Sequence, residues 1–282
     1  MKNLEAYQED CFDFHQEAID NKNTTQADPT YKQRVRQLNP IVRIQYDELN
    51  EIYNDNAALE EIESHGFGGQ ERDDLKKLYS YDSNLIQELK IHLTTINGAK
   101  YSTCPNCTIS EINSFDHYLP KGSFSEFVVN PKNLIPCCQT CNSIKGDIWK
   151  RDGKRVFLNL YLDRLPETQY LFVDFIINEE GIETNFYLNN PNDIENDLFS
   201  LIESHYRGLN LLERFSENSD EVITEFINSI KPCTERLTIE EIREVVDEGC
   251  EENNATFGFN YWKSILKSEL INNENFVNEF IT

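Results

Sequence analysis

The sequence lacks the long apolar segments that direct a chain into or across a membrane. No run of eighteen apolar residues occurs, so no transmembrane helix is expected. The N-terminal stretch MKNLEAYQEDCFDF has no apolar region of the signal-peptide kind, so no secretory signal is expected. No internal repeat is visible. With 282 residues and 39% hydrophobic side chains, the chain is long enough for one large domain or two small ones.

Basic charge is also scarce. The chain has 26 Lys and Arg against 50 Asp and Glu, a formal net charge of −24, whereas a free-standing nucleic-acid binder usually carries a basic face. Residues 101–155 differ, because seven basic residues there stand against five acids. This segment therefore carries +2 (7 − 5) and the remainder −26 (−24 − 2). The acidic remainder serves either solubility or docking on a basic partner, and a partner could supply most of the affinity for nucleic acid.

What the sequence does have is two Cys-x-x-Cys pairs, Cys104 with Cys107 and Cys138 with Cys141. Each tight turn presents two sulfurs to one tetrahedral ion, so the four thiolates predict a structural zinc site. Plain burial of free cysteines is the alternative, but it does not explain two pairs of identical spacing. Zinc-type cysteines and the missing signal predict a reducing, cytoplasmic location. Three scattered cysteines are expected to be packing residues: Cys11, Cys233 and Cys250. Cys137 adjoins Cys138 and would be a ligand only in a different register.

Residues beside these pairs suit the hydrolysis of a phosphodiester, which needs a deprotonated water and an electrophile at the developing charge. His117 has a side chain that can take the proton near neutral pH, and its neighbour Asp116 can hold a hard divalent cation. One carboxylate and one amide oxygen, that of Asn142, suit Mg²⁺ or Mn²⁺, which keep several waters. Lys145 lies one helical turn after Asn142 and could reach a phosphate.

These motifs, within Tyr101–Trp149, resemble the HNH endonucleases, the ββα-metal family. The resemblance implies that Asp116 is the metal-binding acid, that His117 is the general base and that Asn133 orients the loop. Asn142 matches the last ligand position, which many members fill with histidine, so the chain shows His-Asn-Asn rather than His-Asn-His. A structural role for His117 and a helix N-cap role for Asn142 remain open as alternatives.

The expected fold class is α+β, mostly helical. A central zinc-bound ββα-metal (HNH) module at residues 101–155 is flanked by a helical N-terminal region, 1–100, and a C-terminal region, 156–282, of a short β-hairpin and helices. Within the module we expect a strand near 113–118, a second strand near 134–137, and a helix that starts near Gln139 and runs past Trp149.

Apolar spacing and turn residues predict the flanking elements. Residues 1–34 are expected to be weakly structured around one short helix. Further helical regions are predicted over 34–64 and over 73–96, the latter ending at Asn97-Gly98. Val156–Tyr161 could be a strand or an extended segment, and a hairpin over 170–188 turns at Asn178–Gly181. Helices then return, one opening at Thr238 with a capping box and the last running over 257–281.

The sequence therefore predicts a metal-dependent HNH endonuclease that acts on nucleic acid, DNA being favoured over RNA. The order of the elements also resembles the HNH nucleases of antiphage defence operons, of the Septu and retron-associated type. That resemblance implies a role in antiviral defence and a protein partner such as an ATPase subunit. The alternatives are a catalytically silent, zinc-stabilised subunit that binds nucleic acid or protein, and an interaction subunit whose acidic surface is its main function.

Overall fold

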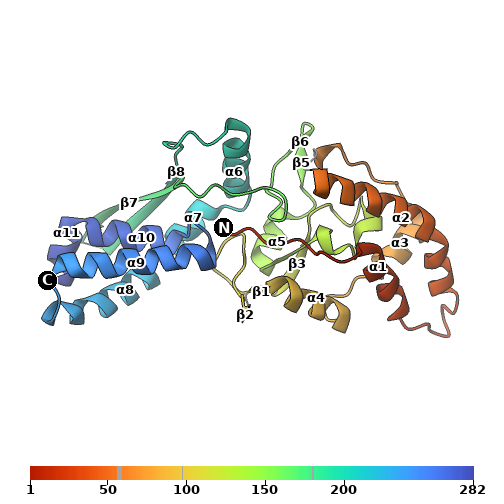
Figure 1. The fold of residues 1–282 in the computed structure, drawn as a ribbon, viewed down its shortest axis with the longest axis horizontal. Coiled ribbons are helices and arrows are strands. Elements are labelled where there is room, and N and C mark those ends of the chain that lie inside the picture. The colour runs from red at the N-terminus through yellow and green to blue at the C-terminus, as the bar shows by residue number, and fades with distance from the viewer. Residues whose placement is uncertain (56–58, 97, 180) are drawn as a thin grey trace. The chain divides into compact units, whose positions relative to one another are not determined.

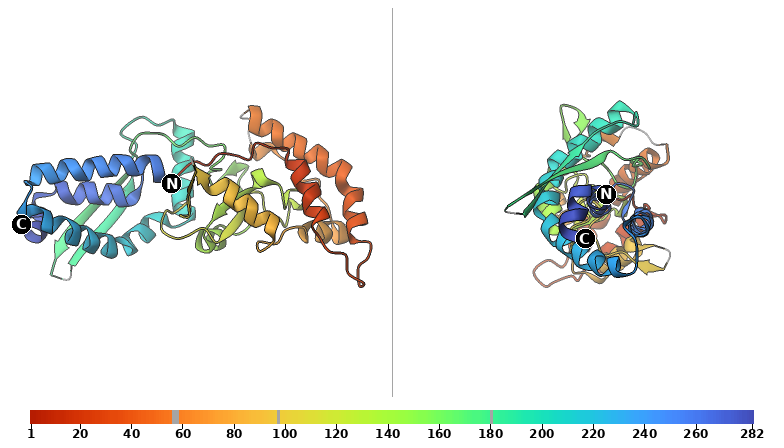
Figure 2. Two further views of the ribbon diagram at one scale, coloured as in Figure 1. Left: turned by 60° about the horizontal axis from the view of Figure 1, so that its bottom comes forward. Right: turned by 90° about the vertical axis from the view of Figure 1, so that its left-hand side faces the viewer.

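The computed structural model describes residues 1–55, 59–96, 98–179 and 181–282. The chain divides into two compact units, one of residues 4–104 and 110–164 and one of residues 1–3, 105–109 and 165–282. Each unit combines helices with antiparallel two-stranded sheets, which confirms the predicted α+β class (Figures 1 and 2). Among the described helices, none has both the length and the apolar character that crossing a bilayer requires.

The unit of residues 4–104 and 110–164 begins with helices. A short helix lies among the first thirty residues as predicted, α1 (Cys11–Asp20), and the helix predicted over 34–64 is α2 (Tyr31–Asp55), followed by a 3-10 turn, η1 (Leu59–Glu61). The helical region predicted over 73–96 consists of two helices, α3 (Gly69–Lys76) and α4 (Asn84–Thr94). The hydroxyl of Ser83 donates to the carbonyl of Ser80 at 2.8 Å, and the turn so formed separates the two helices. Asn97 of the predicted C-cap lies outside the described residues.

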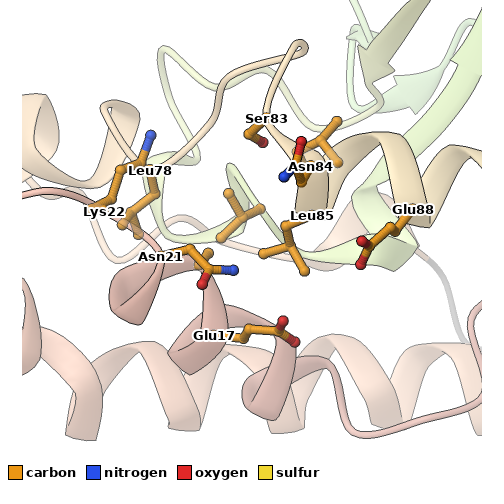
Figure 3. Close-up of a pocket in the computed structure, with 11 residues that line it drawn as sticks. Glu17, Asn21, Lys22, Leu78, Ser83, Asn84, Leu85 and Glu88 are labelled. Atoms are coloured by element: carbon orange, nitrogen blue, oxygen red, sulfur yellow. The ribbon is translucent and has the colours of Figure 1, made fainter.

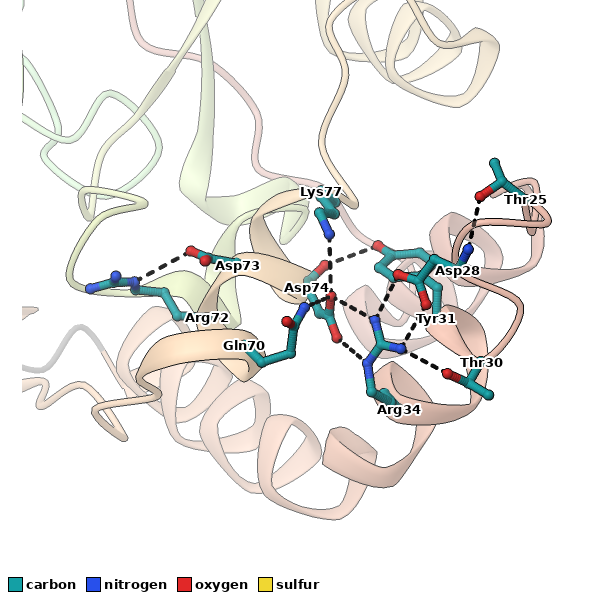
Figure 4. Close-up of polar contacts among 10 residues, drawn as sticks. All are labelled: Thr25, Asp28, Thr30, Tyr31, Arg34, Gln70, Arg72, Asp73, Asp74 and Lys77. Atoms are coloured by element: carbon teal, nitrogen blue, oxygen red, sulfur yellow. Dashed lines mark hydrogen bonds and ion pairs between the residues drawn. The ribbon is translucent and has the colours of Figure 1, made fainter.

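A cluster of polar contacts joins α2 to α3 (Figure 4). The guanidinium of Arg34 pairs with the carboxylates of Asp28 and Asp74, each at 2.7 Å, and Gln70 also donates to Asp74 at 2.7 Å. The side chain of Asp74 is almost fully buried, so its charge depends on these donors. The hydroxyl of Tyr31 donates to the backbone carbonyl of Asp74 at 2.9 Å. These contacts hold α3, the helix that precedes Tyr79, against the start of α2.

The predicted ββα arrangement of residues 113–145 is present. Strand β3 (Ser114–His117) pairs antiparallel with β4 (Leu134–Cys137), and α5 (Gln139–Lys145) follows β4 directly. Two 3-10 turns, η2 (Ser125–Phe127) and η3 (Pro131–Asn133), shape the loop between the strands. The prediction that the helix runs past Trp149 is wrong: α5 ends at Lys145, because Gly146 adopts a positive φ of 55°, which stops the helix.

Two further hairpins belong to this unit, β1 (Thr95–Ile96) with β2 (Ala99–Lys100) and β5 (Lys150–Arg151) with β6 (Lys154–Arg155). After β6 the chain forms bends and turns, so of the two alternatives for Val156–Tyr161 the strand is not adopted.

The other unit is built on the predicted hairpin, β7 (Leu171–Asn178) with β8 (Gly181–Leu188), whose turn includes Glu180, outside the described residues. Figure 2 shows helices of this unit alongside the hairpin. Stacked rings form the core, with the rings of Phe215 and Trp262 5.3 Å apart. The helices are α6 (Asn196–Gly208), α7 (Leu211–Glu217), α8 (Ser219–Ile230), α9 (Ile239–Phe257), α10 (Trp262–Asn272) and α11 (Glu274–Phe276), with a 3-10 turn η4 (Lys231–Glu235) and a π turn η5 (Val277–Ile281).

The C-terminal helices confirm one prediction made from the sequence and contradict another. The capping box at Thr238 is present, because its side chain accepts from the backbone of Glu241 and the Glu241 side chain accepts in return. The single helix predicted over 257–281 is wrong, since α9 ends at Phe257 and α10 begins only at Trp262. Gly258 has a φ of 93°, and a side chain there would collide with the carbonyl of Met1, so the break requires glycine.

Candidate functional site

The two strands and the helix of the ββα segment place the predicted site residues on one small scaffold. In the antiparallel register Asp116 is opposite Ile135 and His117 is opposite Leu134. All eight strand residues are buried, although two of the four in β3 are ionisable. Buried ionisable groups need partners, and the contacts of these groups therefore define the site.

The four predicted zinc cysteines come together. The sulfurs of Cys104, Cys107, Cys138 and Cys141 lie within 4.8 Å of one another, and all four residues are buried. A tetrahedral Zn²⁺ with Zn–S bonds of about 2.3 Å would hold sulfurs about 3.8 Å apart, so the cluster suits this ion. Cys138 is the N-cap of α5, and its sulfur accepts from the backbone N–H of Cys141 at 3.4 Å. Metal binding here would fix the start of α5 against the turn that carries Cys104 and Cys107.

The cluster also settles the register of the cysteines. Cys137 is the last residue of β4, where it pairs with Ser114, and it is not part of the cluster. Cys11 is buried, in agreement with a packing role, whereas Cys233 and Cys250 are only partly buried.

His117 is held in one orientation by its neighbours. Its Nε2 lies 2.9 Å from the carbonyl oxygen of Val128, and the ring of Tyr79 packs edge-on against the imidazole at 4.6 Å. A carbonyl only accepts, so Nε2 carries the proton and Nδ1 keeps a lone pair in the neutral ring. Burial lowers the pKa of His117 to about 3, with the charges of Lys121 and Lys145 acting in the same direction. The imidazole is therefore neutral at pH 7 with a lone pair on Nδ1, and its burial weakens it as a base.

Asn133 ties the two ends of the loop between β3 and β4. Its side-chain oxygen accepts from the backbone N–H of Leu119 at 2.7 Å. Its amide nitrogen donates to the carbonyls of Leu119 at 3.1 Å and Phe127 at 3.2 Å. The loop between these contacts includes Val128, the partner of His117. The amide of Asn133 thus acts on His117 only through the loop.

Lys145 does not face solvent. Its ammonium donates to a carboxylate oxygen of Asp116 at 2.9 Å and to the backbone carbonyls of His117 at 3.2 Å and Tyr118 at 3.3 Å. The residue is only 5% exposed and Asp116 only 6%. Burial raises the pKa of Asp116, and the charge of Lys145 opposes this rise. An ammonium with three acceptors is fully satisfied in place, and here it joins α5 to β3.

Asn142 lies inside α5, and Cys138 occupies the N-cap, so the N-cap alternative for Asn142 is wrong. Its amide nitrogen donates to the hydroxyl of Ser114 at 2.6 Å and to the carbonyl of Phe115 at 3.1 Å, which leaves its oxygen as the remaining donor to a metal. The oxygens of Asp116 and Asn142 are of the kind that Mg²⁺ and Mn²⁺ accept. Because the ammonium of Lys145 neutralises Asp116, the pair fits a divalent cation only once Lys145 has left the carboxylate.

A cavity of about 400 Å³ lies close to this scaffold (Figure 3). The end of α1 and the start of α4 form its walls, and Val129, which follows the partner of His117, contributes to it. None of the predicted catalytic residues lines it. The labelled side chains in Figure 3 are Glu17, Asn21, Lys22, Leu78, Ser83, Asn84, Leu85 and Glu88.

Sequence reasoning missed the contacts that set the state of each site residue. Helical spacing held one usable signal, because Lys145 follows the buried Cys141 by four residues and therefore shares its inward face. The ring of Tyr79 and the carbonyl of Val128 come from separate parts of the chain, and no local pattern marks them.

Comparison with known proteins gives two similar chains. The sequence is 27% identical over 218 residues to protein ea31 of Escherichia phage lambda, covering 72% of this chain and 73% of that protein. It is 34% identical over 61 residues to Septu protein PtuB of Bacillus thuringiensis, which covers 21% of this chain and 23% of PtuB. No family model matches the chain, and no solved structure matches it.

Fold, site and comparisons together define an α+β protein with a buried four-cysteine cluster compatible with zinc. Its sequence is similar along most of its length to a phage protein, and over a short part to a Septu protein.

Proposed function

We propose that the chain is an HNH-type endonuclease that hydrolyses phosphodiester bonds of nucleic acid, DNA being the favoured substrate. The observation that carries the proposal is the arrangement of β3, β4 and α5: an oriented, neutral His117 next to a carboxylate, with a four-cysteine cluster at the start of the helix. The partial similarity to Septu protein PtuB supports the same direction and adds antiphage defence with a protein partner to the proposal.

In the proposed reaction Nδ1 of His117 takes a proton from the attacking water, and the hydrogen bond from Nε2 to Val128 holds the ring in the required tautomer. Asn133 keeps the loop, and with it Val128, in place. A divalent cation at Asp116 and Asn142, if bound, would supply positive charge for the phosphate oxygens. Zinc on the four cysteines would hold the scaffold and take no part in the chemistry.

The test is nicking of a supercoiled plasmid by the purified full chain with Mg²⁺ or Mn²⁺, with EDTA as a control. The wild type is expected to nick in the presence of metal, and His117→Ala to fail while keeping its zinc content. His92→Ala is the matched control, since His92 is exposed and outside the site, and it should nick like the wild type. His117→Gln, which keeps a polar side chain of similar size, guards against misfolding of the alanine variant. Equal nicking by the wild type and both His117 variants would remove His117 as the base.

One observation favours a second function, a catalytically silent subunit that binds nucleic acid or protein. The Asp116 carboxylate is already neutralised by Lys145, so the scaffold is stable without a divalent cation. In that case the wild type binds but does not nick, and His117→Ala leaves its biological role unchanged.

A further inference from the structure

The hairpin β5–β6 concentrates basic charge in an acidic protein. Its two strands are Lys150–Arg151 and Lys154–Arg155, and Asp152 and Gly153 form the turn, with φ values of 50° and 79°. Two residues with positive φ are the signature of a tight turn that matches the twist of a β-ribbon. Residues 150–154 are all exposed. Six residues therefore contain four basic groups, three of them exposed, and one acid, in a chain whose net charge is −24.

The register of this ribbon places like charges directly opposite each other. Lys150 is paired with Arg155, and Arg151 with Lys154. Cross-strand pairs of like charge destabilise a two-stranded ribbon. Arg155 is relieved by the carboxylates of Asp163 at 2.7 Å and Glu60 at 2.9 Å.

The second pair has no such relief, because neither Arg151 nor Lys154 takes part in an ion pair within the described part of the chain. Binding of an external polyanion would remove the repulsion between them. A ribbon of this kind is therefore suited to a partner of high negative charge density.

Residues at both ends of the ribbon contact Tyr118, the residue next to His117. The buried ring of Trp149, just before β5, packs against the ring of Tyr118 at 6.5 Å. The hydroxyl of Tyr118 donates to the carbonyl of Phe157, just after β6, at 2.7 Å. The backbone N–H of Val156 closes the base of the ribbon by donating to Trp149 at 3.0 Å. The basic ribbon is thus anchored to the strand that carries the proposed general base.

We propose that the β5–β6 ribbon is the surface that binds the phosphodiester backbone of the nucleic acid, with Arg151 and Lys154 contacting phosphates. The proposal rests on the proposed nuclease function and names the element that brings the substrate to it. Lysine and arginine contacts to phosphates position a nucleic acid without selecting its sequence. The ribbon therefore supplies affinity, and it explains how a chain of net charge −24 holds a polyanion without a large basic face.

The test measures binding of a fluorescein-labelled DNA duplex, by anisotropy, across a series of NaCl concentrations. All proteins carry His117→Ala, so that binding is separated from cleavage. Arg151→Thr with Lys154→Thr removes the exposed charges while keeping residues that favour strands. The matched control, Lys231→Ala with Arg236→Ala, removes two exposed basic residues outside the ribbon.

Loss of two phosphate contacts is expected to reduce the slope of log K against log salt by about 1.8, since each contact contributes about 0.9. The control pair should leave the slope unchanged. The melting temperature of the ribbon variant should equal or exceed that of the parent, because a repulsive pair is gone.

Three outcomes would overturn the proposal. Binding with the same slope in the ribbon variant places the contacts elsewhere and leaves the nuclease function standing. If the parent does not bind DNA at low salt, the ribbon is not sufficient for binding. The nicking assay then tests the nuclease function separately. A change of oligomeric state on removing the ribbon, seen by sedimentation velocity, would show that it binds the acidic surface of a second copy.

Discussion

Lys145 carries a positive charge that is almost fully withdrawn from water, and each of its three N–H groups has an oxygen acceptor. The cost of removing two charges from water offsets much of the energy of their attraction. If one partner is removed, however, the other remains as an unpaired buried charge. At the scale of one residue, the ammonium of Lys145 therefore supplies the positive charge at Asp116 that the proposed metal cation would have to replace.

Replacing Lys145 with methionine is expected to destabilise the fold by about 3–5 kcal/mol, because the charge of Asp116 then lacks a partner. Mn²⁺ should restore part of the loss, since a divalent cation can take the place of the ammonium. Thermal unfolding with and without Mn²⁺ measures both effects. Lys231→Met, at an exposed position outside this contact, should change neither quantity. An unchanged melting temperature for Lys145→Met would contradict the buried pair, and the double variant with Asp116→Asn should not respond to Mn²⁺.

His15 gives a prediction about pH. It packs between the rings of Phe12 and Tyr46, and Nε2 contacts the side-chain oxygen of Asn39 at 3.2 Å. Burial lowers its pKa to about 4, from about 6.5 in an unfolded chain. The unfolded state thus binds the proton first, so the contribution of His15 is complete above pH 6.5 and is lost as the pH falls towards 4.

The size of this effect is on the order of 3 kcal/mol. His15→Phe keeps an aromatic ring and cannot be protonated, so its melting temperature should fall less than that of the wild type between pH 7 and pH 4.5. His92→Phe, at an exposed position, is the control and should retain the wild-type slope. Parallel pH curves for the wild type and His15→Phe would refute the assignment.

At the scale of elements, zinc bound by the four-cysteine cluster would tie the start of α5 to the turn at Cys104–Cys107. Structural zinc sites contribute directly to the free energy of folding, since the site does not exist in the unfolded chain. Cys107→Ser or Cys141→Ser should release zinc and lower the melting temperature. Cys137→Ser is a close control, because Cys137 is buried next to Cys138 but lies outside the cluster. It should keep its zinc, measured by a colorimetric chelator, and zinc loss equal to that of Cys141→Ser would contradict the cluster.

The strands and the cysteine cluster were predictable because local spacing encodes them. The second Cys-x-x-Cys pair marks the start of α5, and apolar runs mark β3 and β4. The end of α5 had a local signal that the prediction passed over, since Gly146 directly follows Lys145 and glycine commonly ends helices. The ion pair of Lys145 with Asp116 joins residues far apart in the sequence, so no local pattern predicts it. For the same reason the sequence indicated Asp116 and His117 as a pair but not the contacts that hold them.

At the scale of the whole molecule, charge is distributed unevenly along the chain. Residues 165–282 have 7 Lys and Arg against 25 Asp and Glu, a net charge of −18, and residues 1–164 have 19 against 25, a net charge of −6. The sequence predicted a mildly basic segment and an acidic remainder. Most of the excess negative charge of that remainder lies after the ββα segment. Self-repulsion of this size opposes the compact state.

Salt should therefore act on folding and on nucleic-acid binding in opposite directions. The Debye length falls from about 30 Å at 0.01 M to about 8 Å at 0.15 M, so repulsion among the acidic groups of residues 165–282 is screened over this range. We expect the melting temperature to rise by about 2–4 °C, equivalent to about 1 kcal/mol. Affinity for the DNA duplex should fall over the same range, because salt reduces the gain from counterion release. Differential scanning fluorimetry and anisotropy on one set of NaCl solutions measure both trends. A melting temperature that falls as NaCl is added would mean that exposed ion pairs such as Arg36 with Asp20 outweigh the repulsion.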